Sequence, residues 1–183
     1  MLSRLLNLVG LLGVSLVLLV AFYYQLVLYE IPCPLCLLQR GCFVALGIGF
    51  ALNLRCGSSR AHYAMMLISA LAGAGTAGRQ VLAHIAPGDP GYGVDLLGLH
   101  FYSWALIAFA GAIFYVAVML VLVLEPAEPG RGAAGKAPSL PARLTQWLFV
   151  LVVAGNLVST LLECGFGACA DNPTRYEWLS AAG

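Results

Sequence analysis

The sequence has too little charge for a protein that folds in water. Asp, Glu, Lys and Arg together make up 9% of its 183 residues, whereas 61% of the residues are hydrophobic. A soluble domain is roughly 25% charged and 45–50% apolar. The composition therefore predicts a protein whose solvent is lipid. The net charge of +1 carries no information about nucleic acid, but no block of Lys or Arg resembles a nucleic-acid footprint, and we expect no nucleic-acid partner.

Five long apolar stretches follow one another along the chain, each near the ~20 residues that cross a bilayer as a helix. Helices are expected because the bilayer core offers no water to satisfy backbone groups. The first stretch is predicted to be a retained helix, since its apolar run is longer than that of a signal peptide. We expect an all-α membrane protein, a bundle of about five transmembrane helices. The stretches are Leu5–Tyr29, Leu35–Leu54, His62–Ile85, Phe101–Leu124 and Leu144–Leu162.

Lys and Arg are distributed unevenly between the two ends of the predicted helices. If the N-terminus is cytoplasmic, the inner segments carry Arg4, Arg55, Arg60, Arg131, Lys136 and Arg143. The outer segments then carry only Arg40, Arg79 and Arg175. Because cytoplasmic loops of membrane proteins are enriched in Lys and Arg, this asymmetry predicts a cytoplasmic N-terminus and a periplasmic C-terminus.

Composition divides the predicted bundle into three parts. Residues 1–124 hold the first four helices. Residues 125–143 are rich in Pro, Gly, Ala and basic residues, which is typical of a flexible loop, here on the cytoplasmic side. Residues 144–183 hold the fifth helix and a periplasmic tail with two cysteines.

The sharpest motif is Cys33-Pro-Leu-Cys36, which opens the second predicted helix on the outer side. The C-x-x-C spacing is that of exchanging disulfides, and a helix N-terminus stabilises a thiolate. Arg40 follows on the same helix face as Cys36, where it would stabilise a thiolate or polarise a carbonyl of a bound ligand. A structural disulfide gains little chain entropy from so short a loop, and a metal site is the other alternative. We predict a redox role.

A second pair, in Cys164-Gly-Phe-Gly-Ala-Cys169, follows the fifth helix on the same side. With two glycines between them, these cysteines would form either a small mobile disulfide loop or a static staple of the tail. Together with Cys33 and Cys36 they would also make a four-thiolate zinc site, which would be structural and inert.

The remaining candidates carry weaker signals. Cys42 and Cys56 are interpreted as apolar filler or incidental thiols. His84 and His100 flank the outer loop Pro87–His100, where they would move protons, bind a carbonyl or simply lie at the membrane interface.

The run Cys33-Pro-Leu-Cys36-Leu-Leu-Gln-Arg40, after an uncleaved first helix, resembles the disulfide bond formation protein B (DsbB) family. The segment Asp95–Trp104 is also similar, and the likeness covers residues 1–124. The resemblance implies a thiol:quinone oxidoreductase of the bacterial inner membrane. Such proteins reoxidise a periplasmic DsbA-like thiol oxidase and pass two electrons to ubiquinone or menaquinone. It also implies that Cys36 lies next to the quinone, that Arg40 helps to bind it and that Cys33 exchanges with a second disulfide.

The sequence departs from the family pattern in two ways. The best-known members have four helices and a second cysteine pair in the second periplasmic loop, whereas the loop Pro87–His100 has no cysteine here. In addition, a fifth helix leads to Cys164 and Cys169. Our hypothesis is that this tail pair replaces the missing loop pair; the alternative is that Cys33 and Cys36 work alone.

Two other functions stay open at this point. A quinone-independent disulfide reductase or electron conduit usually keeps its redox cysteines within helices, where only Cys42 qualifies. A non-enzymatic membrane protein would use the cysteines as a structural disulfide or a zinc clamp. We favour the enzyme and expect no resident metal ion. Transport is disfavoured because paired intramembrane charges are lacking.

Overall fold

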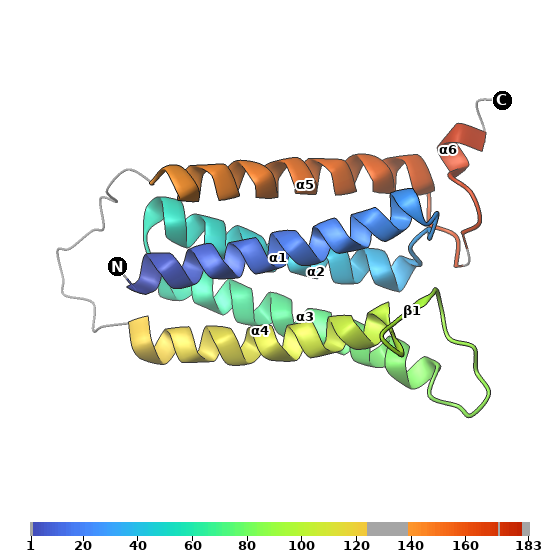
Figure 1. Cartoon of the computed structure of the whole chain (residues 1–183), viewed down its shortest axis with the longest axis horizontal. Coiled ribbons are helices and arrows are strands. Elements are labelled where there is room, and N and C mark those ends of the chain that lie inside the picture. The colour runs from blue at the N-terminus through green and yellow to red at the C-terminus, as the bar shows by residue number, and fades with distance from the viewer. Residues whose placement is uncertain (1, 124–138, 172, 181–183) are drawn as a thin grey trace.

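Five long helices, lying side by side, build an elongated bundle in the computed structural model, which describes residues 2–123, 139–171 and 173–180 (Figure 1). A two-stranded antiparallel hairpin precedes the fourth long helix, and a short helix lies in the C-terminal tail. The elements are α1 (Leu2–Val27), α2 (Pro34–Cys56), α3 (Arg60–Ala83), β1 (Asp95–Leu96), β2 (Leu99–His100), α4 (Phe101–Val123), α5 (Leu140–Cys164) and α6 (Glu177–Ser180).

The all-α membrane architecture expected from the sequence is confirmed, and each predicted span coincides with one long helix. Within the described residues, α1, α2, α4 and α5 are long and apolar enough to cross a membrane. α3 has the same length but is richer in small residues and packs between α2 and α4. A Cβ atom at Gly73 of α3 would collide with the ring of Phe109 of α4. Small residues thus bring these two helices close together.

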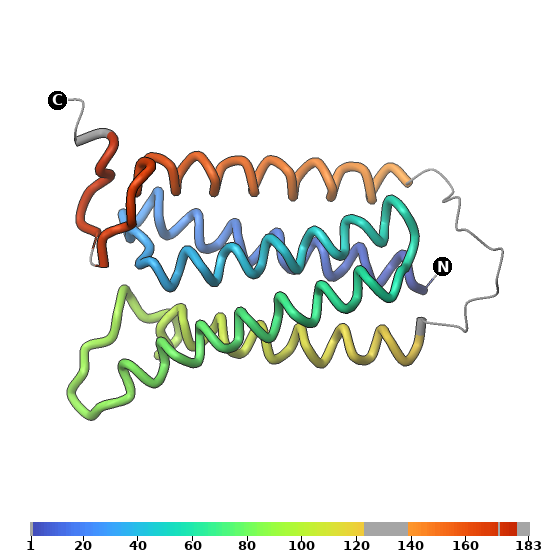
Figure 2. Tube along the Cα trace, turned by 180° about the vertical axis from the view of Figure 1, so that it is seen from behind, coloured from blue at the N-terminus to red at the C-terminus, as the bar shows by residue number. Residues whose placement is uncertain are grey.

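The helices form three layers, with α5 on one side, α1 and α2 in the middle, and α3 and α4 on the other (Figures 1 and 2). The core runs along the middle layer, where Phe43 of α2 stacks on Phe109 of α4 with ring centroids 3.9 Å apart. Large apolar side chains such as Phe114, Val121 and Leu151 point outward and are exposed. An apolar exterior around an ordered core is what a lipid solvent requires.

The start of α5 lies further upstream than the sequence predicted. The helix begins at Leu140 rather than Leu144, because Pro141 fits the first turn of a helix, where its missing N–H group is not needed. The predicted flexible loop 125–143 is thereby shortened, and its residues 125–138 lie outside the described residues.

The two ends of the bundle carry different elements. One end carries the starts of α1 and α5 (Figure 1). The opposite end carries the start of α2, the loop between α3 and α4, the end of α5 and α6. Both cysteine pairs therefore lie at the same end, as the helix count predicted. Which end faces the cytoplasm stays a prediction.

Candidate functional site

The start of α2 is built around the Cys33–Cys36 disulfide. Cys33 is the N-cap residue, and its Sγ accepts a hydrogen bond from the backbone N–H of Cys36 at 3.2 Å. Pro34 occupies the first helical position, where its fixed φ favours the helix. The sequence Cys-Pro-Leu-Cys therefore places both sulfurs at the positive end of the helix dipole.

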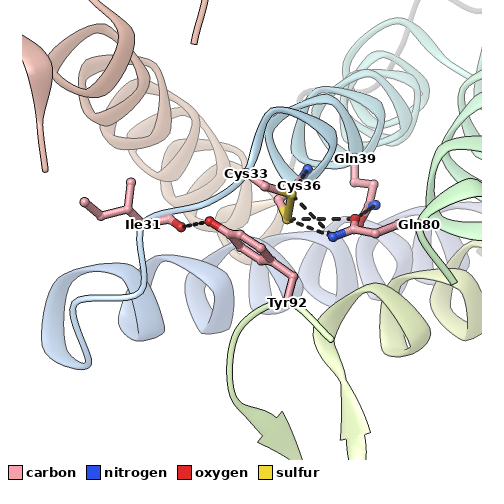
Figure 3. Close-up of a disulfide and its surroundings, with 6 residues drawn as sticks. All are labelled: Ile31, Cys33, Cys36, Gln39, Gln80 and Tyr92. Carbon is pink, nitrogen blue, oxygen red and sulfur yellow. Dashed lines mark hydrogen bonds between the residues drawn. A yellow bond between two sulfur atoms is a disulfide. The ribbon is translucent and has the colours of Figure 1, made fainter. Parts of the chain in front are cut away.

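Two glutamines that the sequence analysis did not single out surround this disulfide (Figure 3). Gln80 of α3 is only 2% exposed, and its Nε2 donates to Cys33 Sγ at 3.3 Å and to Cys36 Sγ at 3.6 Å. Its Oε1 accepts a hydrogen bond from Gln39 Nε2 at 2.9 Å. The available signal was the presence of single glutamines within apolar spans, where polar side chains mark functional sites.

A cavity of about 330 Å³ opens beside Cys36, between α1, α2, the start of α4 and the outer loop. Most of its wall is apolar, with a few polar side chains among the lining residues. Cys36 lines the cavity, whereas Cys33 is only 6% exposed and does not. The lining includes Leu16, Val17, Val20, Tyr24, Ile31, Phe43, Phe101, Trp104 and Ala108, with Glu30, Gln39, Arg40, Tyr92 and Tyr102 as polar members.

Arg40 lines the same cavity but directs its guanidinium towards α1 and α5. Nη1 donates to the Gln25 and Asn156 side-chain oxygens, the latter at 3.4 Å, and Nη2 donates to the Ala21 carbonyl at 3.0 Å. The structure records no hydrogen bond from this guanidinium to Cys36 within the described ranges. Arg40 thus shares the cavity with the sulfur without contacting it through a hydrogen bond.

The side chains around Arg40 extend into the tail, and the sequence analysis did not single them out. We call this group the Arg40 cluster: Arg40, Gln25, Asn156, Ser159, Glu163 and Tyr176. Gln25 Nε2 donates to Ser159 Oγ of α5 and to the Tyr176 hydroxyl at 3.2 Å. Glu163 is 2% exposed, and neither of its carboxylate oxygens has a hydrogen-bond partner in the described structure. It interacts electrostatically with Arg40. A buried carboxyl without partners is costly, so the positive charge beside it matters.

The outer loop is fastened to the segment that leads into α2. The Tyr92 hydroxyl donates to the Ile31 carbonyl at 2.9 Å, as Figure 3 shows. Glu30 Oε1 accepts a hydrogen bond from the Val94 backbone N–H at 2.8 Å. Burial raises the pKa of Tyr92, and the negative charges of Glu163 and Glu30 act in the same direction. Tyr92 therefore stays neutral and keeps its donor.

The two histidines considered as proton carriers share Tyr102 as a neighbour but differ in their polar contacts; the ring of His84 lies 5.5 Å from that of Tyr102, centroid to centroid. His84 Nδ1 lies 3.0 Å from Asp89 Oδ1, which also accepts the Gly91 backbone N–H. These hydrogen bonds, that from Gly91 first, hold the pKa of Asp89 below its ordinary value. His100 stacks on Tyr102, with ring centroids 5.2 Å apart. Neither histidine lines the cavity, so the structure brings neither of them to the disulfide.

Cys164 and Cys169 form the second disulfide, directly after α5. Gly165, at φ 59°, ends the helix in the left-handed region that glycine tolerates. Phe166 at the tip of the loop is 91% exposed and lies 5.4 Å, centroid to centroid, from the ring of Trp178. Cys164 itself is only 8% exposed and Cys169 is partly exposed, so the disulfide lies at the base of a small surface loop.

The structure does not bring the four outer cysteines together as one four-thiolate group. In the part of the chain that the structure describes, no group of three or more His, Cys, Asp or Glu side chains could hold a metal ion. The four outer cysteines form two separate disulfides instead. Cys42 and Cys56 are free; Cys42 is half-buried beside the core and Cys56 is exposed at the end of α2.

The fold and the site define a class: a multi-span α-helical membrane protein with a C-x-x-C disulfide at the mouth of an apolar cavity. The family model described as Disulfide bond formation protein DsbB matches residues 3–93. This match spans α1 to α3 and the first part of the outer loop, and it leaves the β-hairpin, α4, α5 and the tail outside.

Several curated proteins are similar to the chain. The alignment with disulfide bond formation protein B 1 of Pseudomonas fluorescens strain Pf-5 is 135 residues long at 33% identity; it covers 55% of this chain and 79% of that protein. The protein of the same name from strain Pf0-1 is 32% identical over 140 residues, 58% of this chain and 77% of its own length. Disulfide bond formation protein B of Burkholderia thailandensis is 42% identical over 89 residues, 46% of this chain and 52% of the relative.

The chain belongs to the DsbB family, as the C-x-x-C motif and its following arginine predicted. No solved structure matches it significantly.

Proposed function

We propose that the protein is a thiol:quinone oxidoreductase. It oxidises the dithiol of a periplasmic DsbA-like, thioredoxin-like protein and passes two electrons to membrane ubiquinone or menaquinone. The observation that carries this proposal is the position of Cys36, one sulfur of a C-x-x-C disulfide, in the wall of an apolar cavity inside a membrane bundle. Membership of a family named for disulfide bond formation supports the thiol half of the reaction.

The cavity suits a quinone headgroup. Apolar side chains such as Val17 and Phe43 would face the ring, while Arg40 and Gln39 offer N–H donors for a carbonyl oxygen. A bound quinone supplies an acceptor for two electrons and two protons. Arg40 is suited to hold such a ligand because its hydrogen bonds to α1 and α5 fix its guanidinium in place.

The chain's own sulfurs carry out the thiol steps. An incoming thiolate attacks the Cys33–Cys36 bond, a mixed disulfide forms, and the second incoming thiol releases the reduced pair. Cys33 has the environment of a good leaving and exchanging sulfur, since it accepts hydrogen bonds from the Cys36 N–H and from Gln80. Cys36, on the cavity side, is the sulfur that delivers the electrons.

The tail disulfide is proposed to receive electrons from the protein partner and to pass them to Cys33–Cys36. Two observations support this role: both pairs lie at the same end of the bundle, and the loop closed by the second pair leaves Cys169 partly exposed, whereas Cys164 is buried. In this scheme residues 1–124 are the DsbB-like membrane domain and 125–143 are a cytoplasmic connector. Residues 144–183 hold the fifth helix and the disulfide that receives electrons from the protein partner. The protein would lie in the bacterial inner membrane with both pairs on the periplasmic side.

The decisive experiment mixes the purified protein with reduced DsbA-like partner and a soluble quinone, and follows the quinone absorbance. We expect Cys33→Ser to abolish quinone reduction because no disulfide remains beside the cavity. Cys42→Ser is the matched control, since Cys42 is a free cysteine on the same helix. Quinone reduction that persists in Cys33→Ser would refute the proposed function.

A further inference from the structure

The side chain of Gln80 connects α3 to both sulfurs of the Cys33–Cys36 disulfide (Figure 3). Nε2 lies 3.3 Å from Cys33 Sγ and 3.6 Å from Cys36 Sγ, so one amide group reaches both atoms that react. The side chain is almost fully buried, which removes water as a competing donor. A buried amide aimed at a disulfide is the closest polar contact that another helix makes with these sulfurs in the described structure.

A second glutamine holds this amide in place. Gln39 Nε2 donates to Gln80 Oε1 at 2.9 Å, so the oxygen is engaged and the NH₂ group faces the sulfurs. Gln80 Oε1 also lies 3.9 Å from Cys36 Sγ. Once Cys36 carries a proton, this oxygen is available to accept its S–H. The amide therefore serves both a thiolate, through Nε2, and a thiol, through Oε1.

The strength of the hydrogen bonds from Gln80 depends on whether Cys33 and Cys36 are oxidised or reduced. A sulfur in a disulfide is a weak, neutral acceptor, whereas a thiolate accepts a charge-assisted hydrogen bond about twice as strong. Gln80 thus stabilises the reduced pair more than the disulfide. A couple whose reduced form is stabilised is a stronger oxidant.

We propose that Gln80 is a catalytic residue of the Cys33–Cys36 centre, whose amide raises the oxidising power of this disulfide by stabilising the reduced cysteines. The inference rests on the proposed function, in which this disulfide takes electrons from thiols. In that step the incoming dithiol loses two electrons and two protons as its own S–S bond forms. The Cys33–Cys36 bond breaks, one sulfur takes up a proton, the other stays a thiolate beside Gln80, and the second proton passes to water.

A purely structural glutamine would link α3 to α2 through Gln39 and would affect stability alone. The reduction potential separates the two roles because it compares oxidised and reduced forms of the same folded protein. It is measured on the full chain in detergent, by equilibration with glutathione redox buffers and counting of free thiols. All samples carry Cys164→Ser and Cys169→Ser, so that redox-dependent thiols come from Cys33–Cys36 alone.

We expect Gln80→Leu to make the disulfide about ten-fold harder to reduce, which corresponds to ~30 mV in potential. Gln80→Glu keeps the size of the side chain, removes the donor and adds a repelling charge, so its shift should be larger and in the same direction. Gln146→Leu is the control. Gln146 is also a partly buried glutamine of a membrane helix, but its Nε2 donates to the Ala51 carbonyl at 3.1 Å, away from the sulfurs.

An unchanged potential in Gln80→Leu, with fold intact by circular dichroism, would overturn the role of Gln80. If that variant does not fold, Gln80→Glu decides in the same way. The potential is measured without quinone or partner protein. A shifted potential in a protein that cannot reduce quinone would therefore leave the role of Gln80 standing and refute the acceptor half of the proposed function.

Discussion

The two disulfides at one end of the bundle differ in their surroundings. Cys33–Cys36 lies at the start of α2, with an amide of α3 against both sulfurs and a cavity behind Cys36. Cys164–Cys169 closes a loop whose tip, Phe166, is exposed, and the described structure records no side-chain donor to its sulfurs.

In the proposed function, this difference lets one molecule react with two kinds of reactant. In the proposed reaction the protein dithiol, which arrives from water, reaches the tail disulfide through the partly exposed Cys169, because Cys164 is buried. A disulfide in the wall of an apolar cavity is accessible to a small molecule dissolved in lipid. The Arg40 cluster joins the two regions, because Gln25 contacts both Arg40 and the tail residue Tyr176.

The largest effect should come from removing one pair at a time. Cys36→Ser should abolish quinone reduction with any donor, because the sulfur at the cavity is lost. The double variant Cys164→Ser, Cys169→Ser should slow only the reaction with the protein partner, by at least about ten-fold or ~1.4 kcal/mol of activation free energy. Quinone absorbance is followed with the partner or with dithiothreitol as donor. Full turnover with the partner in the double variant would make the tail pair structural.

The Arg40 cluster should be the next most sensitive feature. Arg40→Leu leaves the Gln25 and Ala21 oxygens without their donor and Glu163 without its neighbouring cation. We expect a loss of about 3–5 kcal/mol in the free energy of unfolding, together with weaker quinone binding. Denaturant unfolding in detergent and quenching of tryptophan fluorescence by quinone measure the two effects.

Arg79→Leu provides the control for this charge, because Arg79 is an exposed arginine near the same end of the bundle. Its substitution should change stability by no more than ~0.5 kcal/mol. If Arg40→Leu and Arg79→Leu lowered the free energy of unfolding equally, the Arg40 cluster would not stabilise the contact between the two disulfide regions.

A smaller effect is expected where the outer loop fastens the segment before Cys33. Tyr92→Phe removes the 2.9 Å hydrogen bond to the Ile31 carbonyl, which is worth about 1 kcal/mol. Reduction of Cys33–Cys36 by dithiothreitol should accelerate by about five-fold, the rate equivalent of that energy. Alkylation and mass spectrometry follow each pair separately. Equal acceleration at the tail pair would contradict a local role of Tyr92.

The smallest effect should be on pH dependence. The pKa of the Asp89 carboxyl lies below its ordinary value of 3.8. The hydrogen bonds of the ionised carboxylate therefore stabilise the loop fully above pH 3.8. This stabilisation is lost as the pH falls through the lowered pKa. Reduction of Cys33–Cys36 by a phosphine reductant, corrected for the reagent's own pH dependence, should therefore accelerate slightly only in strong acid. Asp89→Asn should remove this pH dependence, while the tail pair shows none in either protein.

Much of the architecture was readable from the sequence because it depends on local properties. Apolar runs placed all five long helices, and the C-x-x-C motif placed the disulfide at the start of α2. The start of α5 was misplaced because polar and basic residues before Leu144 hid a helical turn that Pro141 permits. The orientation in the membrane and the redox roles of the cysteines stay predictions.

The sequence did not predict the hydrogen bonds around the site, because these bonds join residues that are far apart in the chain. Gln80 is 47 residues from Cys33, and Asn156 is 116 residues from Arg40. A glutamine in an apolar helix indicates a polar contact but does not say with what. The pairing of the cysteines was left open for the same reason: spacing along the chain could not show that they form two separate disulfides.

The sequence by itself determined the solvent, the helices and the place of the C-x-x-C disulfide, because hydrophobic runs and a C-x-x-C motif act over one or two helical turns. Only the tertiary structure decided which sulfur borders the cavity, which amide supports the disulfide and which oxygens hold Arg40. These contacts arise where α1, α2, α3 and α5 pack together, and packing between helices depends on the shapes of all of them at once.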